Sequence, residues 1–190
     1  MSLLNVPAGK DAPDDIFVIV ENPRHLPHIK YEVDKDTGAV FVDRFAPMPM
    51  VFPAHYGYIN QTLGGDGDPV DAFVLTDIDV VPGAVIRCRP VGMLVTEDES
   101  GMDEKLVCVP HTKLDRRYEN INDIDEMFKD NPEIVNKLYA QFSIKNNPFK
   151  FSKNIILSQP LCEDGLISNS RQLDLIKEFL LKNKNSKFYI

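Results

Sequence analysis

The stretch IKYEVDKDTGAVFVDR, residues 29–44, contains two strand-like segments separated by a turn. In its first half, apolar and charged side chains alternate, and this alternation places them on opposite faces of a strand. The segment DKDTG, residues 34–38, has the Asp and Gly content of a hairpin turn. We therefore expect residues 29–34 and 39–44 to pair as antiparallel strands with one polar face.

The flanking sequence extends this β pattern. Between residues 16 and 111, short runs rich in Val, Ile and Phe are broken by Pro, Gly and Asp, and helical periodicity is weak. The expected strands are residues 16–21, 29–34, 39–44, 71–75, 85–95 and 105–109. Five or six such strands predict a small barrel. Beyond Pro110, apolar residues recur at three- and four-residue steps, which predicts one or two helices within 121–142 and a last helix over 172–182.

Length and composition limit the kind of protein. A chain of 190 residues fits one domain, with a barrel core at about 16–111 and a helical part and divergent basic tail at about 119–190. The net charge of −8 argues against nucleic-acid binding but not against a small anionic substrate. Three widely spaced cysteines, no basic leader in MSLLNV and no long apolar run predict a soluble cytoplasmic protein without a membrane partner.

The segment DGDPVD, residues 66–71, places Asp66, Asp68 and Asp71 close together. Two carboxylates about 4 Å apart repel by roughly 4 kcal/mol at an effective dielectric near 20, so a convergent set needs a cation or raised pKa values. Oxygen ligands of this kind favour Mg²⁺, Mn²⁺ or Ca²⁺. A solvated turn is the alternative for this segment, whereas an EF-hand is excluded because Val70 would occupy a ligand position.

A second acidic group, within residues 97–104, includes Asp98 and Asp103 and directly precedes Lys105. Alone it is typical of a charged hairpin tip; together with the first group it favours a metal site. Lys30, Arg44 and Lys105 can make charge-assisted contacts to phosphate oxygens, and Tyr56, in an expected tight HYGY turn, can donate without adding charge. Two arginines on one face of the strand 85–95, Arg87 and Arg89, are expected to be structural.

These residues resemble the soluble family I inorganic pyrophosphatases, and the bacterial members most closely. Residues 66–71 fit the DxDPxD loop of that family. The resemblance covers roughly residues 1–118 and is carried by MSLLNVPAGK, IKYEVDK, FVDRF, HYGYIN, GDGDPVDAFV, PGAVIRCRPVG and DEKLVCVPH. It implies a mainly β (α+β) fold, a five-stranded OB-like barrel with flanking α-helices, that hydrolyses pyrophosphate with Mg²⁺. OB barrels also bind nucleic acids, so the site residues and not the fold decide function.

The resemblance also implies residue roles. Asp66, Asp71 and Asp103 would hold the principal metal ions, and Asp98, Glu21 and Glu32 would complete the acidic site. Asp68 would accept the proton of the attacking water. Phosphate oxygens would be held by Lys30, Arg44, Tyr56 and Lys105. Mn²⁺ would substitute for Mg²⁺, Ca²⁺ would inhibit, and the chain would form a homo-oligomer, a hexamer in bacterial relatives.

Two positions depart from the family on the phosphate side. Phe52 stands where a Tyr is common, and Phe142-Ser143 stands where a Tyr-Lys pair binds phosphate, with Lys145 two positions further on. Two hypotheses follow: an active Mg²⁺-dependent pyrophosphatase, and a catalytically weakened module that binds Mg-pyrophosphate. A third hypothesis, an OB-type binder of single-stranded nucleic acid, conflicts with the acidic barrel segment.

Overall fold

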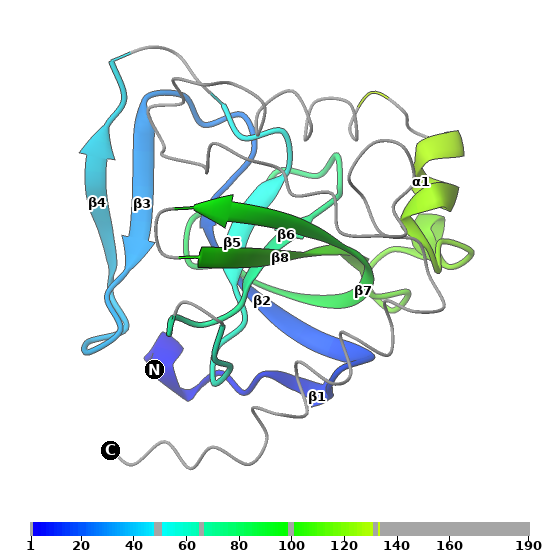
Figure 1. Cartoon of the computed structure of the whole chain (residues 1–190), viewed down its shortest axis with the longest axis horizontal. Coiled ribbons are helices and arrows are strands. Elements are labelled where there is room, and N and C mark those ends of the chain that lie inside the picture. The colour runs from blue at the N-terminus through cyan, green and yellow to red at the C-terminus, as the bar shows by residue number, and fades with distance from the viewer. Residues whose placement is uncertain (1, 48–50, 65–66, 99–100, 131–132, 134–190) are drawn as a thin grey trace.

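The computed structural model describes residues 2–47, 51–64, 67–98, 101–130 and 133, with only the backbone at 95–98, 101–103, 125, 128 and 130. Eight strands and one α-helix are present in these segments (Figure 1). The strands are β1 (Gly9–Asp11), β2 (Asp15–Asn22), β3 (Ile29–Val33), β4 (Val40–Phe45), β5 (His55–Tyr58), β6 (Asp71–Val74), β7 (Val85–Asp98) and β8 (Gly101–Pro110). The helices are two short 3₁₀ turns, η1 (Leu3–Asn5) and η2 (Arg116–Tyr118), and α1 (Ile124–Asp130).

Five strands close into a barrel. The sheet runs β2-β5-β6-β8-β7, and β7 also pairs with β2, so the first and last strands of this run meet. Strands β6 and β8 are parallel and the other barrel pairs are antiparallel. β1 adds to an edge of β2 outside the ring. The closed five-stranded barrel is the OB-like fold that the sequence resemblance implies.

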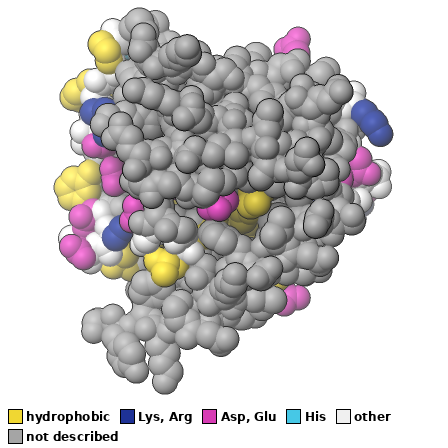
Figure 2. Space-filling view, viewed as in Figure 1, with side chains coloured by type: hydrophobic (Ala, Val, Ile, Leu, Met, Phe, Trp, Pro, Cys, Tyr) yellow, Lys and Arg dark blue, Asp and Glu magenta, His cyan; other side chains and the backbone are white. Residues whose placement is uncertain are grey.

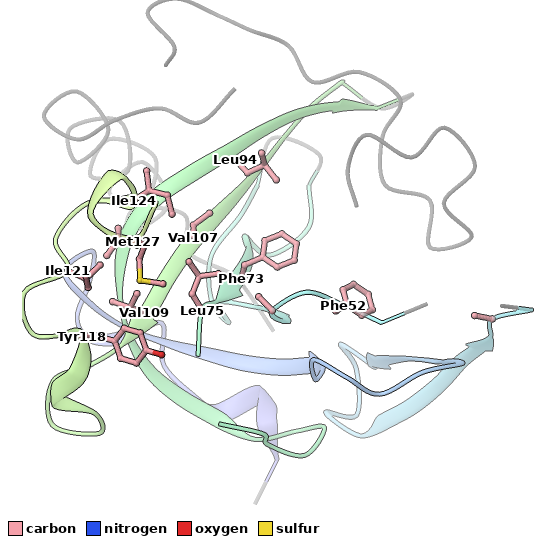
Figure 3. Close-up of a cluster of buried hydrophobic side chains, with 13 residues drawn as sticks. Phe52, Phe73, Leu75, Leu94, Val107, Val109, Tyr118, Ile121, Ile124 and Met127 are labelled. Carbon is pink, nitrogen blue, oxygen red and sulfur yellow. The ribbon is translucent and has the colours of Figure 1, made fainter. Parts of the chain in front are cut away.

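The two faces of the barrel wall carry separate apolar layers. One cluster fills the interior with side chains from β2, β6, β7 and β8, including Val18, Ala72, Cys88 and Leu106. The other covers the outer face of β6, β8 and β7, where Ile124 and Met127 of α1 pack with Val107 and Val109 (Figure 3). Alternation along each strand produces these two layers, because successive side chains point to opposite faces.

The predicted hairpin stands beside the barrel. β3 pairs with β4 within the two segments that were predicted to pair, for example Val33 with Val40. The two strands form a separate two-stranded sheet. Asp34 stabilises the turn by accepting hydrogen bonds from the backbone N–H and the hydroxyl of Thr37 at 2.7 and 2.6 Å. Phe41 and Phe45 of β4 are exposed hydrophobic residues. In the space-filling view, hydrophobic side chains gather at the left edge of the molecule, the side on which β3 and β4 lie in Figure 1 (Figure 2).

Several expectations need correction. The segment HYGY is strand β5, between β2 and β6, and not a tight turn. The second acidic group lies largely within the paired ends of β7 and β8, which extend beyond the expected 85–95 and 105–109. β1 is an additional strand that the sequence pattern did not predict. The expected helix over 172–182 and most of 121–142 lie outside the described residues.

Arg87 and Arg89 are structural, as expected. Arg87 donates to both carboxylate oxygens of Asp15, and Arg89 donates to the backbone carbonyls of Tyr118 and Ile121 at 2.6 and 3.0 Å. These bonds fasten β7 to the neighbouring segments. In the part of the chain that the structure describes, we find no helix both long and apolar enough to cross a membrane.

Candidate active site

Three predicted residues meet on the outer face of the barrel. Tyr56 lies on β5, Asp71 on β6 and Lys105 on β8, and these strands are neighbours in the sheet. The parallel register places Asp71 opposite Lys105. Lys105 Nζ donates to Asp71 Oδ2 at 2.6 Å, and the Tyr56 hydroxyl donates to the same oxygen. Asp71 is therefore the common acceptor of two groups predicted to bind phosphate.

Burial makes this contact energetically important. The Lys105 side chain is only 4% exposed, whereas that of Asp71 is 25% exposed. A buried ammonium group is costly unless a charged or hydrogen-bonded partner compensates for its lost hydration. The Tyr56 ring is held by Phe52, stacked at 5.4 Å between centroids, and by Phe73 at 5.2 Å. Phe52 therefore positions the Tyr56 ring by packing against it.

Glu21 lies at the end of β2, and its side chain is 9% exposed. Its Oε1 accepts hydrogen bonds from the Val33 backbone N–H at 2.8 Å and from Lys35 Nζ at 3.2 Å. Burial raises the pKa of Glu21, against the opposing effect of Lys35, and the charge of Asp71 raises it further.

Tyr58 and Glu21 both interact with Lys35. Lys35 Nζ lies 3.5 Å from the centre of the Tyr58 ring. The Tyr58 hydroxyl is buried and has no hydrogen-bond partner among the described residues. Burial, followed by the charge of Glu21, raises the pKa of Tyr58 to about 12.

We expect Tyr58→Phe to stabilise the fold by about 1 kcal/mol, because removing an unsatisfied buried hydroxyl removes its desolvation cost. Urea unfolding of the metal-free protein measures this difference. A less stable variant would show that the hydroxyl has a partner in solution.

The remaining predicted cations lie on the hairpin. Lys30 on β3 is opposite Arg44 on β4, and both contact Asp43 Oδ2, at 3.0 Å from Lys30 Nζ and 2.7 Å from Arg44 Nε. Partial burial opposes ionisation of Asp43, but the hydrogen bonds from Arg44 and Lys30 outweigh it and lower the pKa. Glu32 is exposed and lies 3.7 Å from Lys30.

Asp43 and Lys35 were missed by the sequence analysis. Both adjoin predicted site residues or turns, Asp43 directly before Arg44 and Lys35 within DKDTG. The only local signal for Asp43 is its position directly before Arg44, a candidate phosphate-binding residue. No local signal distinguishes Lys35 from an ordinary turn residue, because its partners Glu21 and Tyr58 are distant in sequence.

The acidic loop is only partly described. Asp68 is exposed in the loop between β5 and β6. The two ends of this loop are linked by a hydrogen bond from the Val70 N–H to the Thr62 hydroxyl oxygen at 2.9 Å. Asp66 lies outside the described residues, as do the side chains of Asp98 on β7 and Asp103 on β8. Within the residues that are described, three or more acidic, His or Cys side chains do not converge in a metal-binding arrangement.

Comparison with known proteins places the chain in a family. The family model described as inorganic pyrophosphatase matches residues 18–158. The chain belongs to the inorganic pyrophosphatases. More specifically, it is a bacterial-type member of the soluble family I enzymes.

Individual relatives support the same family assignment. An inorganic pyrophosphatase of Salmonella typhimurium is 56% identical over 142 residues, which cover 75% of this chain and 78% of that protein. One from Vibrio cholerae is 58% identical over 127 residues, covering 67% and 72%. The solved pyrophosphatase of Helicobacter pylori superposes with a TM-score of 0.76 at 33% identity, over 95% of this chain and 99% of that one.

The predicted pyrophosphatase residues that the structure describes fall into two groups. Tyr56, Asp71 and Lys105 form one connected group and Lys30, Glu32 and Arg44 another, with Glu21 between barrel and hairpin. Phe142, Ser143 and Lys145, where the sequence resemblance predicts a departure from the family, lie outside the described residues.

Proposed function

We propose that this chain hydrolyses inorganic pyrophosphate to two phosphates at the outer face of the barrel, between β5, β6, β8 and the β3–β4 hairpin. The observation that carries the proposal is the shared acceptor Asp71, which holds Lys105 and Tyr56 beside an acidic loop. A polyanionic substrate bridged by dications needs carboxylates and cations in one site. Family membership supports the same reaction.

The metal in this proposal is Mg²⁺. Family I pyrophosphatases require a metal ion, and the donor set here consists of carboxylate oxygens, which suit Mg²⁺. Asp66, Asp71 and Asp103 would hold the principal ions, and Asp98, Glu21 and Glu32 would complete the set. Strand register supports this grouping, because position 103 is two residues before Lys105 on β8 and position 98 lies opposite 101. When bound, the metal supplies Lewis-acid charge and a more acidic water.

The side chains of the chain itself have distinct proposed tasks. Asp68 accepts the proton of the attacking water, and its exposed position in the loop leaves it accessible to solvent. Lys105 and Tyr56 hold phosphate oxygens from the barrel side, and Lys30 and Arg44 hold them from the hairpin side. Four donors directed at developing negative charge on the leaving phosphate stabilise the transition state more than the substrate.

A phosphate-release assay tests the proposal. With pyrophosphate and Mg²⁺ we expect phosphate production that stops when the metal is chelated and returns when Mg²⁺ is restored in excess. Mn²⁺ should support turnover, and Ca²⁺ should inhibit it because it accepts looser coordination than Mg²⁺. Calorimetric binding of Mg-pyrophosphate without phosphate release would instead favour the non-catalytic module, which none of the described contacts or relatives supports.

Assembly and location belong to the same proposal. We expect one domain per chain and, by resemblance to bacterial relatives, a homohexamer. Light scattering coupled to size-exclusion chromatography measures the molar mass of the assembly. A cytoplasmic location is supported by Cys88 and Cys108, both of which are free and buried thiols.

A further inference from the structure

The β3–β4 hairpin is joined to the barrel by side chains and not by a continuous sheet. Its two strands form a sheet of their own, to one side of the barrel in Figure 1. At the end of β2, Asn22 bonds to a single residue of β3 through both ends of its amide. Asn22 Oδ1 accepts from the Tyr31 N–H at 2.8 Å, and Asn22 Nδ2 donates to the Tyr31 carbonyl at 2.9 Å.

This arrangement requires an amide. Asn22 is 2% exposed, so its side-chain amide is withdrawn from water, and its two hydrogen bonds to the Tyr31 backbone are partly buried. Backbone N–H and C=O groups buried without partners cost free energy, and a planar amide offers the donor and acceptor that a neighbouring strand would supply. The adjacent Glu21 reaches Val33, two residues further along β3, and bonds only its N–H. Glu21 therefore cannot satisfy Tyr31.

The joint lies between the two groups of site residues. Tyr31 is flanked in sequence by Lys30 and Glu32, and Lys30 is paired in register with Arg44. Tyr56, Asp71 and Lys105 belong to the barrel. A shift of β3 relative to β2 would move the hairpin cations away from the barrel donors as one unit, because the β3–β4 pairing is independent of the joint.

We propose that Asn22 is a positioning residue that sets the affinity for pyrophosphate by fixing the hairpin, and with it Lys30 and Arg44, against the barrel. The proposal rests on the proposed function. Its first test is Asn22→Leu, which keeps the side-chain size and removes both bonds. KM for pyrophosphate at saturating metal should rise about tenfold, equivalent to about 1.4 kcal/mol, with a smaller fall in kcat.

A matched control separates positioning from general destabilisation. Asn60 Nδ2 also makes partly buried hydrogen bonds to backbone carbonyls, those of Leu4 and Val6 at 2.9 and 2.8 Å, but it holds the N-terminal segment and makes no bond to β3. Asn60→Leu should lower the melting temperature and leave KM unchanged. A similar rise of KM in both variants would overturn the proposal.

Amide hydrogen exchange gives a readout that does not depend on activity. In Asn22→Leu, exchange of the Tyr31 amide should accelerate about tenfold or more, while amides in the β6–β8 ladder keep their protection. Unchanged exchange at Tyr31 would contradict the inference. If the unmodified protein released no phosphate, the proposed function would fail, but the exchange result would still show whether Asn22 holds the hairpin.

A double-mutant cycle tests the route of the effect. If Asn22 acts through the hairpin cations, Asn22→Leu should raise KM only about threefold in a Lys30→Met background, because one of the two positioned cations is already lost. A full tenfold effect in both backgrounds would show that Asn22 acts on substrate affinity by another route.

Discussion

Replacing Asp68 by Asn is expected to lower kcat for pyrophosphate by about a hundredfold or more, the usual contribution of a positioned general base. Asn keeps the size and one acceptor oxygen of Asp68 but cannot take a proton from water. Because Asp68 is exposed, the substitution should leave the urea unfolding midpoint within experimental error. Steady-state phosphate release at saturating Mg²⁺, with unfolding monitored in parallel, measures both quantities.

A second exposed carboxylate provides the control for this variant. The Asp77 side chain is 56% exposed, and its carboxylate pairs with Arg117 and not with Tyr56, Asp71 or Lys105. Asp77→Asn makes the same chemical change and should leave kcat unaltered. Turnover by Asp68→Asn equal to that of Asp77→Asn would remove the role assigned to Asp68.

The hairpin and most barrel strands could be predicted because the information is local. Alternation in IKYEVD and the turn residues of DKDTG identify β3 and β4 without reference to the rest of the chain. The apolar runs that form β2, β6, β7 and β8 are also visible locally, although the ends of β7 and β8 are too polar to be recognised. β7 and β8 stay paired as far as Asp98 opposite Gly101, so both strands continue beyond their apolar segments.

Strand β5 could not be predicted because its cause is non-local. The glycine in HYGY resembles a turn signal, but an ideal Cβ at Gly57 would lie 1.9 Å from the Ile19 carbonyl oxygen. The residue is Gly because the backbones of β2 and β5 approach closely there. A glycine is found both in turns and where two strands approach closely, so the sequence alone does not separate the two cases. The pairing of β5 with β2 and β6 shows that the segment is a strand.

The site was predicted through family resemblance more than through residue patterns. The predicted roles of Asp71, Lys105 and Tyr56 came from matching motifs, and in the structure Lys105 and Tyr56 both donate to Asp71. The supports of the site were not predicted. Asn22, Asp43 and Lys35 act on partners across the barrel-hairpin joint or within the hairpin, and nothing in their immediate sequence indicates those partners.

Replacing Asp71 by Asn is expected to reduce turnover by about a thousandfold, because one change removes a proposed shared metal ligand and the charge opposite Lys105. It should also lower the free energy of unfolding by about 2 kcal/mol in the absence of metal. Removing one partner of a buried ion pair costs about 3–5 kcal/mol, and the partial exposure of Asp71 and the remaining Asn oxygen reduce this. Phosphate release and urea unfolding measure the two effects.

The two losses can be separated with Lys105→Met. In the Asp71→Asn background this second change removes the uncompensated buried ammonium group, so part of the lost stability should return while turnover stays low. Asp15→Asn, which breaks the partly buried pair with Arg87, is the control: it should lower stability and preserve kcat. A double variant whose stability losses simply add would show that Asp71 does not compensate the charge of Lys105. Wild-type turnover in Asp71→Asn would show that the metal site lies elsewhere.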